Sequence, residues 1–184
     1  KRRIIVKKLA AVETLSRADT FIFDKTGTIT LGRPRLVSTV SSSSEYDKKT
    51  LLAIAEAIER NSLHPLAKAL VAAGKEEKVK LYTATLVKEI IGSGISGIVN
   101  KKAYVLKKEE GGGKGMTIAM FEKEKRIGEF VFEDEIKKDS ADIVKKLKQL
   151  GFSIHIFTGD RKKAAEEIVK RLGDETIEVK SECT

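Results

Sequence analysis

The sequence contains no tryptophan, and aromatic residues make up only 5% of its 184 residues. Platforms that stack nucleic-acid bases need aromatic side chains, so we expect no nucleic-acid partner. The single cysteine, Cys183, cannot form a disulfide within the chain, which fits a reducing, cytosolic setting. No run of 18 apolar residues and no signal peptide with an apolar core is visible, so no membrane span is expected.

What the sequence does contain is enough apolar and charged residues for ordered domains. Hydrophobic residues make up 41% and charged residues 34%, which supports a real core and argues against long disorder. The net charge of +9 leaves phosphorylated small molecules, a membrane surface or nucleic acid as anionic partners. Although the lack of aromatic residues argues against it, a basic nucleic-acid-binding module is the alternative that charge alone supports, and it would bind unrelated DNA with strong salt dependence.

Both ends of the chain alternate helices with short apolar strands. The predicted elements are helix 1–18, strand 20–23, helix 137–151, strand 152–157, helix 161–174 and strand 176–181. Strands that alternate with helices through short loops predict a parallel sheet. These segments therefore predict an α/β domain.

The middle of the chain has a different pattern. Two helices are predicted at 48–60 and 64–77, followed by β segments at 81–90, 94–100, 102–108, 116–122 and 126–133. Turn residues separate the β segments, which favours an antiparallel sheet. We therefore expect an inserted α+β domain at 34–123, between a first part of the α/β domain at 1–33 and a second part at 124–184.

Asp24 stands at the carboxyl end of the strand 20–23, and Thr158 follows the strand 152–157. Ligands of open parallel sheets bind beyond this edge, where a carboxylate, a hydroxyl and backbone N–H groups suit a phosphoryl group and Mg²⁺. Gly27 lets the backbone approach an anion closely. An ionised aspartate needs no base to attack phosphorus. For an isolated aspartate after a strand, a role in capping the turn is the alternative.

The segment D-K-T-G-T-I-T at 24–30 resembles the phosphorylation signature of P-type ATPases, and T-G-D at 158–160 resembles their second motif. The resemblance implies a haloacid-dehalogenase-like domain, incomplete at its C-terminus, in which ATP with Mg²⁺ phosphorylates Asp24. It also implies that Asp24 and the Thr26 carbonyl ligate Mg²⁺ and that Thr158 contacts the phosphate. Supporting roles are implied for Lys25, Thr28, Gly159 and Asp160.

Thr26 separates a pump from a soluble phosphatase. Soluble phosphatases of this superfamily carry an aspartate two positions after the nucleophile, whereas this sequence has a threonine that cannot activate water as a carboxylate does. A longer-lived acyl phosphate suits a pump, whose intermediate must outlast a conformational change. The alternative is a soluble phosphatase or phosphotransferase with a cap domain.

The segment N-S-L-H-P-L-A-K-A-L at 61–70 resembles the His-Pro motif of heavy-metal (type IB) P-type ATPases, with Leu63 where the family has glutamate. The resemblance implies that His64 orients the adenine ring and that Glu59 lies near its amino group. A potassium-transporting P-type ATPase subunit is the closest rival, since D-K-T-G-T-I-T-L-G suits it too.

The segment G-S-G-I-S-G at 92–97 fits the dinucleotide fingerprint G-x-G-x-x-G. That reading requires a following helix, whereas the next residues are β-like, so we reject it. Heavy-metal ATPases carry a Gly-x-Gly in the nucleotide pocket, and the resemblance assigns Gly92 and Gly94 to it. An ordinary hairpin turn is the alternative.

The third motif of the family, Gly-Asp-Gly-x-Asn-Asp, is missing, and so is a Gly-Asn pair of the nucleotide pocket. The resemblance therefore implies a soluble fragment from the cytoplasmic side of an integral membrane pump, weakly active or inactive alone. The remaining Mg²⁺ ligand, the actuator and transmembrane domains and the path of the transported ion are expected elsewhere in the same polypeptide. Copper export is expected from the frequency of copper pumps in the family, and silver, zinc, cadmium, lead and cobalt stay open.

Overall fold

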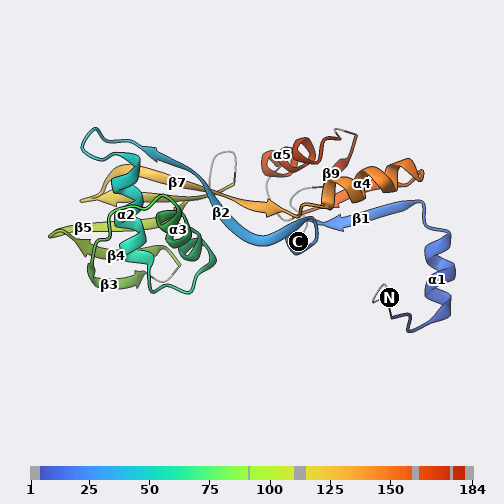
Figure 1. Cartoon of the computed structure of the whole chain (residues 1–184), viewed down its shortest axis with the longest axis horizontal. Helices are drawn as coiled ribbons and strands as arrows, with labels where there is room; N and C mark the ends of the chain where they lie inside the picture. The colour runs from blue at the N-terminus through green and yellow to red at the C-terminus, as the bar shows by residue number, and fades with distance from the viewer. Residues whose placement is uncertain (1–4, 91, 110–114, 159–161, 175, 181–184) are drawn as a thin grey trace. The chain divides into compact units, whose positions relative to one another are not determined.

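The computed structural model describes residues 5–90, 92–109, 115–158, 162–174 and 176–180. The chain forms two compact units (Figure 1). The outer unit consists of Lys1–Leu31 and Ile136–Thr184, and the inserted unit is Gly32–Glu135. Among the described residues, no helix has both the length and the apolar character needed to cross a membrane.

The outer unit contains the predicted parallel sheet, with strand order β1-β8-β9. β1 (Thr20–Asp24) pairs in parallel with β8 (Ser153–Phe157), and β8 pairs in parallel with β9 (Glu178–Lys180). The helices α4 (Ser140–Gln149) and α5 (Lys162–Leu172) provide the connections between strands that a parallel sheet requires. The alternation of strands and helices therefore predicted this sheet correctly.

One face of this sheet packs against the two helices. Ile154 and Ile156 of β8 are buried because alternate side chains of a strand point to the same face. They share a core with residues of α4, of α5 and of the chain before β9: Val144, Ile168, Val169, Leu172 and Ile177. Phe21 and Phe23 of β1 pack against this core, which fixes the strand that ends in Asp24.

Helix α1 (Leu9–Ser16) is shorter than the predicted helix 1–18, of which residues 1–4 lie outside the described part of the chain. None of its residues is buried. Helices gain most of their stability from packing an apolar face. Because no residue of α1 is buried, the length of this helix depends on local helix propensity, and it ends short of the predicted limits.

The inserted unit contains the predicted antiparallel sheet, with strand order β2-β7-β6-β5-β4-β3. Its strands are β2 (Thr30–Ser41), β3 (Ala84–Ile90), β4 (Gly94–Val99), β5 (Lys102–Glu109), β6 (Met116–Glu122) and β7 (Lys125–Ile136). The helices α2 (Lys48–Glu59) and α3 (Pro65–Glu76) lie side by side against the sheet (Figure 1). The core between them includes Leu51, Leu70, Leu106, Met120 and Phe130.

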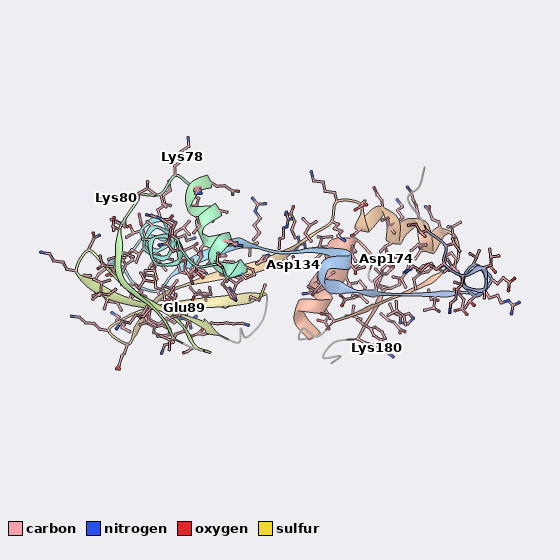
Figure 2. All side chains as sticks on the ribbon, turned by 90° about the horizontal axis from the view of Figure 1, so that it is seen from below. Lys78, Lys80, Glu89, Asp134, Asp174 and Lys180 are labelled. Atoms are coloured by element: carbon pink, nitrogen blue, oxygen red, sulfur yellow. The ribbon has the colours of Figure 1, made fainter. Side chains whose placement is uncertain are left out.

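The limits of the inserted unit differ from the predicted 34–123. β7 pairs with β6 in an antiparallel ladder from Lys125 to Phe132, so this strand belongs with the inserted sheet. Near the end of the unit, Asp134 (labelled in Figure 2) accepts a hydrogen bond from the Arg33 backbone N–H at 2.8 Å. Long-range pairing therefore moves the second limit from 123 to 135.

Candidate active site

Asp24 lies at the carboxyl end of β1 with its side chain exposed. It is the register partner of Phe157, the last residue of β8, so Thr158 lies at the same edge of the sheet. Thr158 is buried, and its backbone N–H donates to the Lys180 carbonyl at 3.1 Å. The structure thus brings Asp24 and Thr158 to one edge, as predicted, whereas Gly159 and Asp160 lie outside the described residues.

The loop Lys25–Ile29, called the 25–29 loop below, turns sharply after Asp24. Gly27 adopts φ +77°, which an L-residue with a side chain rarely accepts. Beyond its own chain neighbours, no atom of the described part of the chain lies within 4 Å of the position where a Cβ would stand. The Thr30 hydroxyl accepts from the Gly27 N–H at 3.3 Å and donates to the Lys25 carbonyl at 3.0 Å. Thr26 and Thr28 are exposed, while Lys25 is buried.

Two residues from the second part of the outer unit hold this loop. The Lys137 ammonium donates to the Gly27 carbonyl at 2.6 Å. The Lys137 backbone N–H and the Ser140 hydroxyl both donate to the Ile29 carbonyl, at 3.0 Å and 2.9 Å. Neither residue was predicted, because no local pattern connects positions more than 100 residues apart in sequence with this loop.

The oxygen atoms available at the end of β1 are of the type that Mg²⁺ prefers, but they are too few to fill its coordination shell. Asp24 and Thr26 are both exposed, and they offer a carboxylate and a backbone carbonyl oxygen. Mg²⁺ prefers oxygen ligands and keeps several waters or substrate oxygens around one or two protein carboxylates. Within the described ranges, no group of three or more His, Cys, Asp or Glu side chains could hold a metal ion. Asp24 and Thr26 therefore fit two positions of a magnesium shell.

Glu59, the last residue of α2, is buried at the C-terminal end of that helix. Burial raises the pKa of the Glu59 carboxyl, the hydrogen bond with Ser62 opposes this shift, and the charge of Glu89 (labelled in Figure 2) adds to it. A Cβ added at Gly97 of β4 would lie 3.1 Å from Ile58, so the last turn of α2 packs directly on β4. Glu59 thus lies beside the β3–β4 hairpin.

We predict that Glu59→Gln changes the pH dependence of stability. The folded pKa of Glu59 lies above its usual value of 4.5, so the folded protein binds the Glu59 proton more tightly than the unfolded chain does. The contribution of this protonated carboxyl to the free energy of unfolding is fully present below pH 4.5. It is lost as the pH rises through the folded pKa. Glutamine stays neutral, so the difference in unfolding free energy should shift in favour of the variant with rising pH and then level off. A difference that does not vary between pH 4 and 8, measured by urea unfolding, contradicts this.

His64 is the N-cap of α3, and Pro65 occupies the first helical position as predicted. The His64 Nδ1 accepts a hydrogen bond from the Leu66 N–H at 3.2 Å. Since Nδ1 accepts, the neutral ring carries its proton on Nε2. The ring is exposed, and so is Leu63 before it, so Nε2 is accessible to a ligand.

Gly92 and Gly94 differ in what surrounds them. A Cβ on Gly94 would lie 1.9 Å from the Leu106 carbonyl oxygen of β5, and its φ is +153°. Gly92 has φ +71°, and within the described ranges, its chain neighbours apart, no atom lies within 4 Å of the position of a Cβ. Pairing of β4 with β5 therefore requires glycine at 94. β4 follows instead of a helix, so rejection of the dinucleotide fingerprint was correct.

Comparison with known protein sequences finds relatives along nearly the whole chain. The family described as haloacid dehalogenase-like hydrolase matches residues 18–182. A copper-exporting P-type ATPase of Legionella pneumophila is 31% identical over 189 residues, covering 92% of this chain and 25% of that protein. A zinc/cadmium/lead-transporting P-type ATPase of Escherichia coli is 31% identical over 187 residues, covering 94% and 25%. The chain thus spans about a quarter of the length of these relatives.

Solved structures of heavy-metal ATPases are similar to this chain in fold. A zinc-transporting PIB-type ATPase in the E2.Pi state superposes with a TM-score of 0.82 at 28% identity, covering 95% of this chain and 30% of that chain. The catalytic domain of the CPx-ATPase CopB-B superposes with a TM-score of 0.80 at 32% identity, covering 98% and 67%. These likenesses confirm the predicted α/β domain with its α+β insertion.

Proposed function

Because this chain belongs to the haloacid dehalogenase-like hydrolase family and its relatives are heavy-metal P-type ATPases, we propose that it is the ATP-binding and self-phosphorylating part of such a pump. The observation that carries the proposal is the exposed Asp24 carboxylate at the sheet edge, followed at once by a tight loop with glycine at φ +77°. The same edge carries Thr158.

The proposed reaction is phosphoryl transfer to Asp24. An oxygen of the Asp24 carboxylate attacks the γ-phosphorus of ATP, the bond to the β,γ-bridging oxygen breaks, and ADP leaves with the bonding electron pair. Asp24 and Thr26 are the residues of this chain that would hold Mg²⁺, which neutralises phosphate charge when bound. Thr158 and the N–H groups of the 25–29 loop are proposed to bind the transferred phosphoryl group, with Lys25, Gly159 and Asp160 supporting them.

The absence of a carboxylate at Thr26 favours a pump over a soluble phosphatase. Thr26 is exposed beside Asp24 and has no group that could take a proton from an attacking water. The acyl phosphate on Asp24 is therefore expected to persist until another part of the protein delivers water to it.

ATP is proposed to bind in the inserted unit near Glu59, His64 and the turn that contains Gly92 and Gly94. The position of Glu59 beside the β3–β4 hairpin and the exposed Nε2 of His64 support this proposal. An oxygen of the Glu59 carboxyl could accept a hydrogen bond from the adenine amino group.

We predict that His64→Ala has two separable effects. Loss of the N-cap should reduce the free energy of unfolding by about 1 kcal/mol, and loss of the ring should weaken ATP binding several-fold. His64→Asn is the matched control, because asparagine also caps helices but has no imidazole. It should restore stability and leave ATP binding weak, as measured by calorimetric titration and urea unfolding. Full ATP affinity in both variants contradicts the placement of adenine beside His64.

The whole protein is proposed to move a heavy-metal cation across a membrane, with this chain on the cytoplasmic side and with transmembrane and actuator domains as its partners. Relatives at the same identity are named for copper and for zinc, cadmium and lead, so the proposal names the class of metal. Copper, expected from the sequence, is one member of that class. The heavy-metal relatives favour this reading over the potassium-transporting subunit.

The test uses the full-length protein that contains this chain. With Mg²⁺, ATP labelled on the γ-phosphate and a heavy-metal ion, the protein should form an acid-stable phosphate that hydroxylamine removes. Peptide mapping should place the label on Asp24. Absence of such an adduct with every metal tested would overturn the proposal.

A further inference from the structure

We propose that Lys137 is a positioning residue of the 25–29 loop, which acts on the phosphorylation site through the Gly27–Thr28 peptide group. The inference rests on the proposed phosphorylation of Asp24. Its basis is the 2.6 Å hydrogen bond from the Lys137 ammonium to the Gly27 carbonyl, which joins residues 110 positions apart.

The planar peptide group makes this contact directional. In a trans peptide the C=O and the next N–H point in opposite directions. When Lys137 holds the Gly27 carbonyl, the Thr28 N–H is turned to the opposite side of the loop. One ammonium group therefore sets the direction of a backbone dipole in the loop that follows the nucleophile.

The conformation of Gly27 depends on such a bond. Glycine has no Cβ to restrict φ and ψ. Among the described residues, leaving out Gly27 and its two chain neighbours, no atom lies within 4 Å of where a Cβ of Gly27 would stand. Gly27 is exposed, so core packing does not fix it either. The bond from its own N–H to the Thr30 hydroxyl is 3.3 Å long, whereas the bond from Lys137 is charge-assisted and shorter.

The end of the loop is held independently of the Lys137 side chain. Ile29 is buried in the core of the outer unit, and its carbonyl accepts from the Lys137 backbone N–H and from the Ser140 hydroxyl. These contacts remain when the Lys137 side chain is truncated. Removal of the ammonium should therefore release the middle of the loop while the fold persists.

Lys138 provides a matched control. It carries the same charge one position later and is exposed. Loss of the Lys138 side chain changes the net charge near the loop as much as loss of the Lys137 side chain does. A difference between the two alanine variants consequently reports the contact with Gly27, and Lys137→Arg tests whether another cationic donor restores it.

The experiment measures phosphorylation of the full-length protein by ATP in rapid-quench kinetics. Lys137→Ala should lower the rate constant at saturating ATP about tenfold, because a small misplacement of groups around a reacting centre slows the chemical step. The ATP concentration at half-saturation should stay within about twofold, because that constant reports ATP binding and not the chemical step. Lys137→Arg should recover most of the rate, and Lys138→Ala should match the unmodified protein.

Equal rates for Lys137→Ala and Lys138→Ala overturn the inference, and so does a rate loss that Lys137→Arg does not relieve. Amide hydrogen exchange of the peptide covering 24–30 gives a second reading that needs no activity. Exchange there should be faster in Lys137→Ala than in Lys138→Ala, and equal exchange also overturns the inference. If the unmodified protein forms no phosphate on Asp24 while this exchange difference is present, the proposed function fails and the positioning contact stands.

Discussion

Asp24→Asn is expected to lower ATP-dependent phosphorylation by on the order of a thousand-fold or more, to the background of the assay. The asparagine amide has nearly the shape of the carboxylate but lacks the anionic oxygen that attacks phosphorus. The Asp24 side chain is exposed, so this substitution should leave the core of the outer unit unchanged. The measurement is the acid-stable label from γ-labelled ATP in the full-length protein, with and without hydroxylamine.

Asp19→Asn is the matched control for this prediction. Asp19 is also exposed and precedes β1 at the opposite end of the same strand, where its carboxylate accepts from the Thr20 hydroxyl at 2.8 Å. This control should be phosphorylated at the normal rate, and both variants should bind ATP and unfold at the normal temperature. Labelling of Asp24→Asn at the level of Asp19→Asn would place the phosphate on another residue.

Gly94→Ala is expected to reduce the free energy of unfolding of the inserted unit by about 2–4 kcal/mol. The new Cβ would lie 1.9 Å from the Leu106 carbonyl oxygen and 2.9 Å from its carbonyl carbon. Both atoms belong to the backbone of β5, so β4 and β5 must separate to relieve the clash. The φ of +153° adds strain, because residues with a side chain rarely adopt it.

Urea unfolding followed by tyrosine fluorescence measures this effect selectively. The sequence has three tyrosines and no tryptophan, and Tyr46, Tyr82 and Tyr104 all belong to the inserted unit. Gly92→Ala is the control, since its φ is +71° but, apart from its chain neighbours, no described residue has an atom within 4 Å of the added Cβ. It should cost about 1 kcal/mol from backbone strain alone. An equal decrease in the free energy of unfolding in the two variants would contradict the prediction, because the clash with Leu106 would then add nothing to the backbone strain.

The two glycines also show where the sequence and the structure lead to different explanations. The sequence favoured a nucleotide pocket as the reason for both glycines. The structure gives Gly94 a requirement of its own, namely its close approach to β5, while Gly92 has no such neighbour. Nucleotide binding therefore remains a proposal for both positions, and Gly92 is the position at which a substitution tests it with less loss of stability.

The sequence by itself indicated the chemistry proposed for Asp24 and determined the kind of most elements. Alternating strands and helices were sufficient for the parallel sheet, turn-separated β segments for the antiparallel sheet, and D-K-T-G-T for an aspartate at a strand end. These features are local: hydrophobic periodicity and turn residues act over a few positions.

The tertiary structure alone decided which distant residues meet. Pairing of β7 with β6 placed the limit of the inserted unit at 135, and the chain beyond it brought Lys137 and Ser140 to the 25–29 loop. Contacts between positions more than 100 residues apart produce no hydrophobic period in one sequence, because they depend on which strands pair and in which register.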